Sequence, residues 1–265
     1  LFSEGNMPRV LNQTIPTTDG EKEPATCVAN PEFTAETPRL AAMTTKALEL
    51  LQNDNGFLLQ VESASPDKAD HQADACGLIG EVGQLDEAVQ AVQNWVNKTG
   101  EETLIVATAD HAHTAQITYN DAPTAGRTTK LTTADGSEMT VNFATSKTNE
   151  DEDALGGQEH TGAQLRVAAS GPGAANVTGQ IDQTDLFFLV NNALGIDGIN
   201  HGLTFENKMQ PDSAPADGSS KSSLIGDLGL AVLLTLAGVL GLVSVIALAF
   251  PFAVDSILGP LAKLK

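Results

Sequence analysis

Histidines and carboxylates gather in three short segments of the chain. Four of the five histidines lie there. The candidate ligands are Glu62, Asp67, His71, Asp110, His111, His113 and His160. Oxygen and nitrogen ligands without thiolate suit zinc, manganese or magnesium, and a carboxylate such as Glu62 suits the harder magnesium. The pattern therefore indicates a metal site. Two metals held close together there would hold the attacking and leaving oxygens of a phosphoryl transfer.

The spacing of Asp67 and His71 supports a shared metal, although it is weak evidence alone. Positions i and i+4 of a helix face the same side, so this carboxylate and this imidazole could bind one ion. With 34 acidic residues and five histidines in 265 positions, chance gives about 0.6 acid–histidine pairs at any fixed spacing. A single histidine is more often a hydrogen-bonded structural residue. The concentration of several such pairs carries the prediction.

The apolar pattern predicts strands that end at these residues. An apolar helical face begins near Pro38 and runs to Leu51, and Gly56 introduces a strand-like run, 57–61, that ends at Glu62. A second helix, 85–96, stops at Gly100 and precedes a buried strand at 104–107, just before Asp110. Alternating helices and apolar strands predict an α/β layered sheet. Sites in such sheets form beyond the carboxyl ends of strands.

Two further elements follow in the sequence. The flanks of Asp135-Gly136, residues 131–134 and 138–143, predict a hairpin. A last helix is predicted from Thr184 to Leu194.

Charge and composition exclude one class of partner. The formal charge is −20 and aromatic residues make up only 4% of the chain, so a nucleic acid would find neither a basic surface nor a stacking platform. The two cysteines, Cys27 and Cys76, allow one disulfide. That bond would close a loop of about 50 residues and contribute about 4 kcal/mol in the chain-entropy model. Composition alone leaves two reduced core cysteines equally open.

A long apolar run near the C-terminus predicts a membrane anchor. Residues 228–250 carry no charge, and a helix of that length spans about 34 Å, enough for a bilayer core. We therefore predict a transmembrane helix at 227–251, a flexible linker at 204–226 and a short cytoplasmic tail at 252–265, which places residues 1–203 outside the cytoplasm, in the periplasm or the extracellular space. A processed lipid-anchor signal is the alternative for this run.

The chain resembles bacterial alkaline phosphatases. The segments that carry the resemblance are GFLLQVESASPDKADH at 56–71, VATADHAHT at 106–114 and QEHTGAQLRVAASGPGAAN at 158–176, which follow the family's own order. LFSEGNMP at 1–8 also resembles an internal segment of the family. The match covers most of residues 1 to 197. The resemblance implies the C-terminal part of a three-layer α/β/α sandwich. The expected fold is this part together with the C-terminal transmembrane helix.

The resemblance implies a role for each candidate residue. Asp67, His71 and His160 resemble the first zinc site, Asp110 and His111 part of the second, and Glu62 part of a magnesium site, so the expected cofactors are two Zn²⁺ and one Mg²⁺. Lys68 resembles the lysine that contacts phosphate through water, and His113 one that orients a zinc carboxylate. The remaining residues with an implied role are the disulfide pair Cys27 and Cys76.

The implied activity is hydrolysis of small phosphate monoesters through a phosphoserine intermediate, by a homodimer. The nucleophilic serine, the phosphate-binding arginine and the remaining metal ligands belong to the family's N-terminal half, which has no match here. This chain alone is therefore expected to be inactive. Two alternatives stay open: a sister phosphodiesterase or sulfatase, and a non-catalytic membrane-tethered protein that binds metal or phosphate.

Overall fold

The computed structural model describes residues 2–16, 23–120, 122, 124–146 and 157–195, together with the backbone of 243–250. The helices are α1 (Leu40–Leu51), α2 (Ser65–His71), α3 (Ala75–Thr99) and α4 (Asp185–Ala193), with a 3-10 turn η1 at Ala174–Asn176. The strands are β1 (Phe57–Ser63), β2 (Glu102–Ala109), β3 (Ala115–Thr118), β4 (Arg127–Thr132), β5 (Glu138–Phe143), β6 (Ala168–Ser170) and β7 (Val243–Phe250). The mixture confirms the predicted α/β class.

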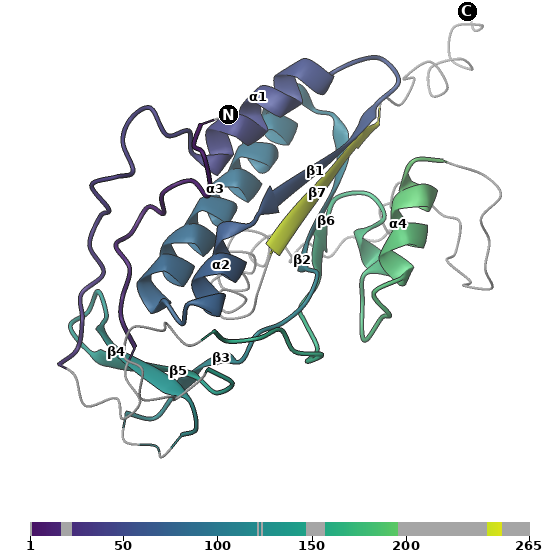
Figure 1. The fold of residues 1–265 in the computed structure, drawn as a ribbon. Coiled ribbons are helices and arrows are strands. Elements are labelled where there is room, and N and C mark those ends of the chain that lie inside the picture. Colours follow the sequence, from purple (N-terminus) through teal and green to yellow (C-terminus); the bar gives the residue numbers. More distant parts are fainter. Residues whose placement is uncertain are drawn as a thin grey trace, which may run out of the picture.

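The larger sheet has helices on both faces. Its strand order is β1-β7-β2-β6, and because β7 is antiparallel to both β1 and β2, those two strands are parallel to each other. Helices α1 and α3 cover one face and α4 lies on the other (Figure 1). The side chains of β2 contact the helices on both faces: Ile105 packs with Leu48 of α1, whereas Leu104 and Val106 pack with Leu189 of α4. Its successive side chains point to opposite faces, and both faces are buried.

Helix α3 connects the two parallel strands and is longer than the predicted helix 85–96. It begins at Ala75, where the Asp74 side chain accepts a hydrogen bond from the amide of Gly77. It ends at Gly100, whose φ of 75° is the left-handed conformation that favours glycine. The predicted stop is therefore confirmed.

A second, three-stranded sheet has the order β3-β5-β4. Strands β4 and β5 are antiparallel and are joined through Asp135-Gly136, as predicted. Thr133 N donates to Ser137 O at 2.8 Å and Gly136 has a φ of 82°, so the loop closes as a tight turn. Strand β3, which was not predicted, follows the Asp110–Thr114 loop and extends this sheet.

The prediction of a helix at the C-terminus is wrong for residues 243–250. They form β7, which lies between β1 and β2 in the sheet (Figure 1). A charge-free apolar run suits a membrane helix and a strand buried on both faces equally well, because neither leaves a periodic polar face. Residues 196–242 and 251–265, including the predicted linker and tail, lie outside the described residues. Among the described residues, no helix has the length and apolar character needed to cross a membrane.

The strand assignment makes a testable prediction for Ile246. This residue pairs with Gln60 of β1 and with Val106 of β2. Proline has no amide hydrogen and is confined to edge strands and bulges, so Ile246→Pro should leave a carbonyl of the ladder without its partner and lower the free energy of unfolding by about 1–3 kcal/mol. Urea unfolding of the full chain measures this. Ile246→Val, which keeps the amide, is the control, and equal stability of both variants would contradict the strand.

Candidate metal centre

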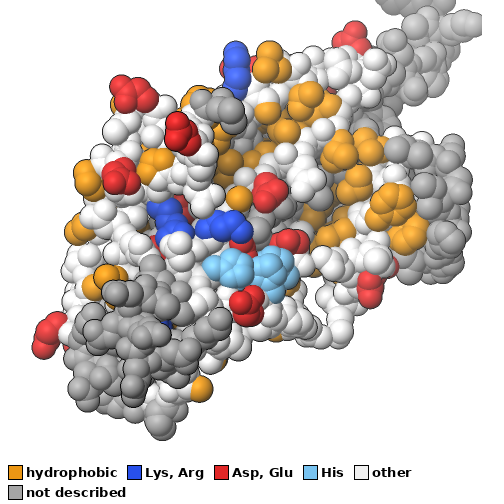
Figure 2. All heavy atoms as spheres, viewed as in Figure 1, with side chains coloured by type: hydrophobic (Ala, Val, Ile, Leu, Met, Phe, Trp, Pro, Cys, Tyr) orange, Lys and Arg blue, Asp and Glu red, His pale blue; other side chains and the backbone are white. Residues whose placement is uncertain are grey.

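Three segments that are far apart in sequence bring histidines and carboxylates together at the surface. Helix α2 carries Asp67 and His71, the loop after β2 carries Asp110, His111 and His113, and a later segment carries His160. The last two segments are joined by the bridge between Ala112 and Thr161, with Thr161 N donating to Ala112 O at 2.7 Å. Figure 2 shows histidine side chains gathered on this face, beside acidic and basic ones.

Asp67, His71 and His160 form a triangle of donor atoms. The Oδ1 atom of Asp67 lies 3.4 Å from His71 Nε2 and 3.1 Å from His160 Nε2, and the two Nε2 atoms lie 3.0 Å apart. Tetrahedral zinc with bonds of about 2.0–2.1 Å separates neighbouring ligand atoms by about 3.3 Å. The three atoms therefore fit one face of a zinc tetrahedron. This is the set expected for the first zinc site.

His113 also lies within ligand distance of this cluster. The four residues Asp67, His71, His113 and His160 offer ligand atoms within 4.8 Å of one another. His113 Nε2 is 2.8 Å from Asp67 Oδ1, a hydrogen-bond distance that is short for two zinc ligands. Burial lowers the pKa of His113, against the opposing hydrogen bond to Asp67. A neutral His113 that donates to the carboxylate matches its expected orienting role.

The carboxylate of Asp67 is held in its ionised form. Burial disfavours its charge, but hydrogen bonds from Lys68 and His113 outweigh burial and keep the pKa of Asp67 well below its usual range. Lys68 Nζ donates to Asp67 Oδ2 at 2.8 Å, so the two carboxylate oxygens have separate partners. The lysine side chain is half exposed, whereas Asp67 is buried. Lys68 therefore lies between the carboxylate and solvent, where an anion would arrive.

Asp110 and His111 lie beside the triangle. His111 Nε2 is 3.5 Å from Asp110 Oδ2 and 3.7 Å from Asp67 Oδ1, and its ring stacks on His160 with centroids 3.5 Å apart. The Nδ1 atom of His111 is buried and has no hydrogen-bond partner among the described residues. A cavity of about 390 Å³ opens next to this pair, bordered by residues 161–165, Val167, residues 181–183 and Leu186. Asp110 and His111 thus supply two donors and an adjoining space, but not a complete ligand set.

Glu62 stands apart from these ligands. It lies on β1, one residue before the end of the strand, and its side chain is exposed. It is not part of the four-residue cluster. Its position at the carboxyl end of β1 agrees with the sequence expectation.

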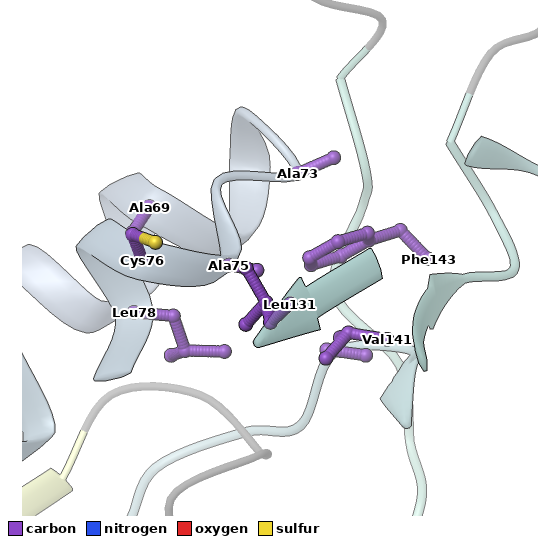
Figure 3. Packing of buried hydrophobic residues seen from close by; sticks show 9 residues of the cluster. Ala69, Ala73, Ala75, Cys76, Leu78, Leu131, Val141 and Phe143 are labelled. Atoms are coloured by element: carbon purple, nitrogen blue, oxygen red, sulfur yellow. The ribbon is translucent and has the colours of Figure 1, made fainter. Parts of the chain in front are cut away.

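The short helix α2 is held by a small apolar core. Ala69 and Ala73 pack with Cys76 and Leu78 near the start of α3, and this group meets the second sheet (Figure 3). The sheet contributes Leu131, Val141 and Phe143. Cys27 and Cys76 form the disulfide that the family resemblance implied, with Cα atoms 5.4 Å apart. The disulfide ties the N-terminal segment to α3, and this core holds α3 against α2, the helix that carries Asp67 and His71.

Two residues that reasoning from sequence missed are Gln158 and Thr114. Gln158 is fully buried, and its carbonyl oxygen accepts a hydrogen bond from His71 Nδ1 at 2.6 Å. Thr114 Oγ1 donates to Gln158 Oε1 at 2.6 Å. Two signals were present: each lies within two residues of a candidate histidine, and each stands in a segment that carries the family resemblance, 106–114 or 158–176.

Comparison with known proteins identifies the family of this chain. The alkaline phosphatase family model matches residues 1–154. Alkaline phosphatase H of Pseudomonas aeruginosa is 51% identical and alkaline phosphatase of Escherichia coli 49% identical, each over 199 residues, or 74% of this chain. Streptomycin-6-phosphate phosphatase of Streptomyces griseus is 40% identical over 68% of the chain. The chain spans only 40 or 41% of the length of these relatives. On this evidence the chain belongs to the alkaline phosphatase family.

Proposed function

We propose that this chain is the part of a metal-dependent phosphate monoester hydrolase that holds the first zinc ion. The observation that carries the proposal is the triangle of Asp67, His71 and His160, whose edges of 3.0–3.4 Å suit tetrahedral zinc. Family membership supplies the reaction class. The relatives compared above are all named as phosphatases, which favours a monoesterase over a phosphodiesterase, a sulfatase or a non-catalytic binding protein.

The proposal assigns a role to each of the candidate residues. Asp67, His71 and His160 hold zinc, with His113 fixing the carboxylate of Asp67. Asp110 and His111 contribute to a second zinc site, and Glu62 to a magnesium site. When bound, the metals supply positive charge that stabilises the negative phosphoryl oxygens. Lys68, with its half-exposed ammonium group, attracts the phosphate and orients it through water.

The surface around the site makes the metals and Lys68 decisive for binding. The chain carries 34 acidic and only 14 basic residues, so its overall field repels a dianionic phosphate ester. Local cations must therefore overcome that repulsion. Small phosphate monoesters are the proposed substrates, because no described feature selects a particular alcohol.

The compartment and assembly are part of the same proposal. The disulfide between Cys27 and Cys76 supports a location outside the cytoplasm, since such bonds persist in oxidising compartments. Thiol labelling in intact cells checks this, because free thiols at both positions would argue against it. A homodimer is proposed on family resemblance alone, and sedimentation measures it.

The test of the activity is a chimera. The matching 199 residues of the Escherichia coli relative are replaced by those of this chain, so that the relative supplies every other part. The folded chimera should hydrolyse p-nitrophenyl phosphate in a zinc-dependent way, and much faster than bis(p-nitrophenyl) phosphate or p-nitrophenyl sulfate.

His160→Ala in the chimera should remove most of the activity and reduce the zinc content, because one corner of the triangle is lost. Glu87→Gln, at an exposed position on α3, is the matched control and should change neither. A folded chimera without monoesterase activity would overturn the proposal, and a preference for the diester or the sulfate would transfer it to the sister class.

A further inference from the structure

Gln158 links the metal ligands without offering a ligand itself. Its backbone amide donates to His71 O at 3.1 Å, and its carbonyl oxygen accepts from His71 Nδ1 at 2.6 Å. A carbonyl oxygen carries no hydrogen, so Nδ1 must be the protonated nitrogen of His71. The lone pair is then on Nε2, the atom that faces Asp67 and His160. This is the tautomer that a zinc ion requires at that position.

The side chain of Gln158 fixes where that carbonyl lies. Its Oε1 atom accepts from Thr114 Oγ1 at 2.6 Å, and its Nε2 atom lies 3.3 Å from both the carbonyl oxygen and Oδ1 of Asp70. Thr114 follows His113 in sequence and Asp70 precedes His71. One buried amide therefore joins α2, the loop after β2 and the segment of His160.

The network continues into the smaller sheet. Thr114 Oγ1 lies 2.8 Å from Thr145 Oγ1 and accepts a hydrogen bond from Thr145 N at 3.0 Å. Thr145 lies two residues after the end of β5. The position of Gln158 is thus set by the end of the sheet as well as by the helix.

We propose that Gln158 is a positioning residue for the first zinc site: it selects the tautomer of His71 and holds the segment of His160 against α2. The inference rests on the metal site proposed above. Partners of this kind orient the ligands before the metal arrives, and their loss weakens binding by about 10–100-fold.

The test uses the full chain with Gln158→Leu, which keeps the approximate volume and removes both polar atoms. Zinc affinity, measured by competition with a chromophoric chelator, should fall about 10–100-fold. Nitrogen-15 NMR of the histidine rings in the zinc-free chain gives a second, independent measurement. His71 should be protonated on Nδ1 in the wild type and should show both tautomers in the variant.

Gln84→Leu is the matched control. Gln84 is also buried, accepts from Leu40 N at 3.2 Å and donates to Glu81 Oε2 at 2.9 Å, with no contact to the histidines. The Gln84→Leu variant should be less stable than the wild type but should keep the wild-type zinc affinity and the wild-type tautomer of His71. An equal loss of zinc affinity in both variants would overturn the inference, because the effect would then be general destabilisation.

Wild-type affinity together with an unchanged tautomer in Gln158→Leu would also overturn it. If that variant does not fold, Thr114→Val, which removes the hydrogen bond to Gln158 together with the contacts of Thr114 Oγ1 to Thr145, should weaken zinc binding several-fold; unchanged affinity there would overturn the inference. If the wild-type chain binds no zinc, the proposed metal site fails, while the zinc-free NMR measurement still decides the role of Gln158.

Discussion

Asp67→Asn is expected to reduce zinc affinity more than any other single change in the cluster. The Oδ1 atom of Asp67 has the Nε2 atoms of His113, His160, His71 and His111 around it, at 2.8, 3.1, 3.4 and 3.7 Å. Asparagine keeps the shape but removes the charge. Loss of a residue that only orients a ligand costs about 10–100-fold, so loss of this charged ligand should cost more than about 100-fold.

The physical reason is that one carboxylate serves several partners. Its negative charge attracts the metal. Its Oδ1 atom accepts a hydrogen bond from His113, and its Oδ2 atom pairs with Lys68. A neutral amide weakens all three interactions and presents a donor to at least one group that is itself a donor. Chelator competition measures the affinity. The visible spectrum of the cobalt-substituted chain reports whether tetrahedral coordination survives.

Asp110→Asn separates the two proposed sites. Asp110 is about half exposed and contacts His111 rather than the triangle. This variant should keep the first zinc ion at wild-type affinity. If Asp67→Asn bound zinc as tightly as the wild type, or if Asp110→Asn had the larger effect, the ligand assignment would be wrong.

The candidate ligands are easier to identify along the sequence than the residues around them, because ligand chemistry is local. Carboxylate and imidazole types, the i, i+4 spacing of Asp67 and His71, and strand ends at Glu62 and Asp110 are all visible along the chain. Gln158 was not visible in this way. Its role depends on contacts with His71, Asp70 and Thr114, which arise only when three segments meet.

The same distinction between local and distant contacts explains which elements of the fold were predicted. Helix α1, strands β1 and β2 and the β4–β5 hairpin have periodicity or turn residues that specify them locally, and the structure confirms them. Residues 243–250 have no such local signal. Their apolar run is compatible with either a helix or a strand, and pairing with β1 and β2, distant in sequence, decides between them.

Asp74→Ala is expected to cause the largest loss of stability at a single side chain outside the metal cluster. Asp74 is fully buried, and its carboxylate accepts from Arg9 Nη1 at 2.7 Å and from Thr14 N at 2.8 Å. It also accepts from Thr14 Oγ1 at 2.9 Å and caps α3 through Gly77 N at 3.0 Å. Alanine would leave the largely buried Arg9 charge and two backbone amides unpaired.

Removal of one partner from a buried ion pair costs about 3–5 kcal/mol, and we expect the free energy of unfolding in urea to fall by that amount. Asp182→Ala is the matched control. Asp182 also caps a turn, accepting from Thr184 N at 2.9 Å and Thr184 Oγ1 at 2.7 Å, but it is exposed. Its loss should cost about 1 kcal/mol or less. Similar losses for the two variants would contradict the view that burial makes Asp74 important.

The same variant should weaken zinc binding, because the side chain of Asp74 anchors the turn that follows α2 to Thr14 and to the start of α3. The preceding Ala73 has a φ of 51°, a left-handed conformation that the surrounding contacts must maintain. If α2 loses this anchor, Asp67 and His71 lose their fixed positions relative to His160. Zinc binds only the folded arrangement, so at a given zinc concentration it should raise the free energy of unfolding of Asp74→Ala by less than that of Asp182→Ala, whose site is intact.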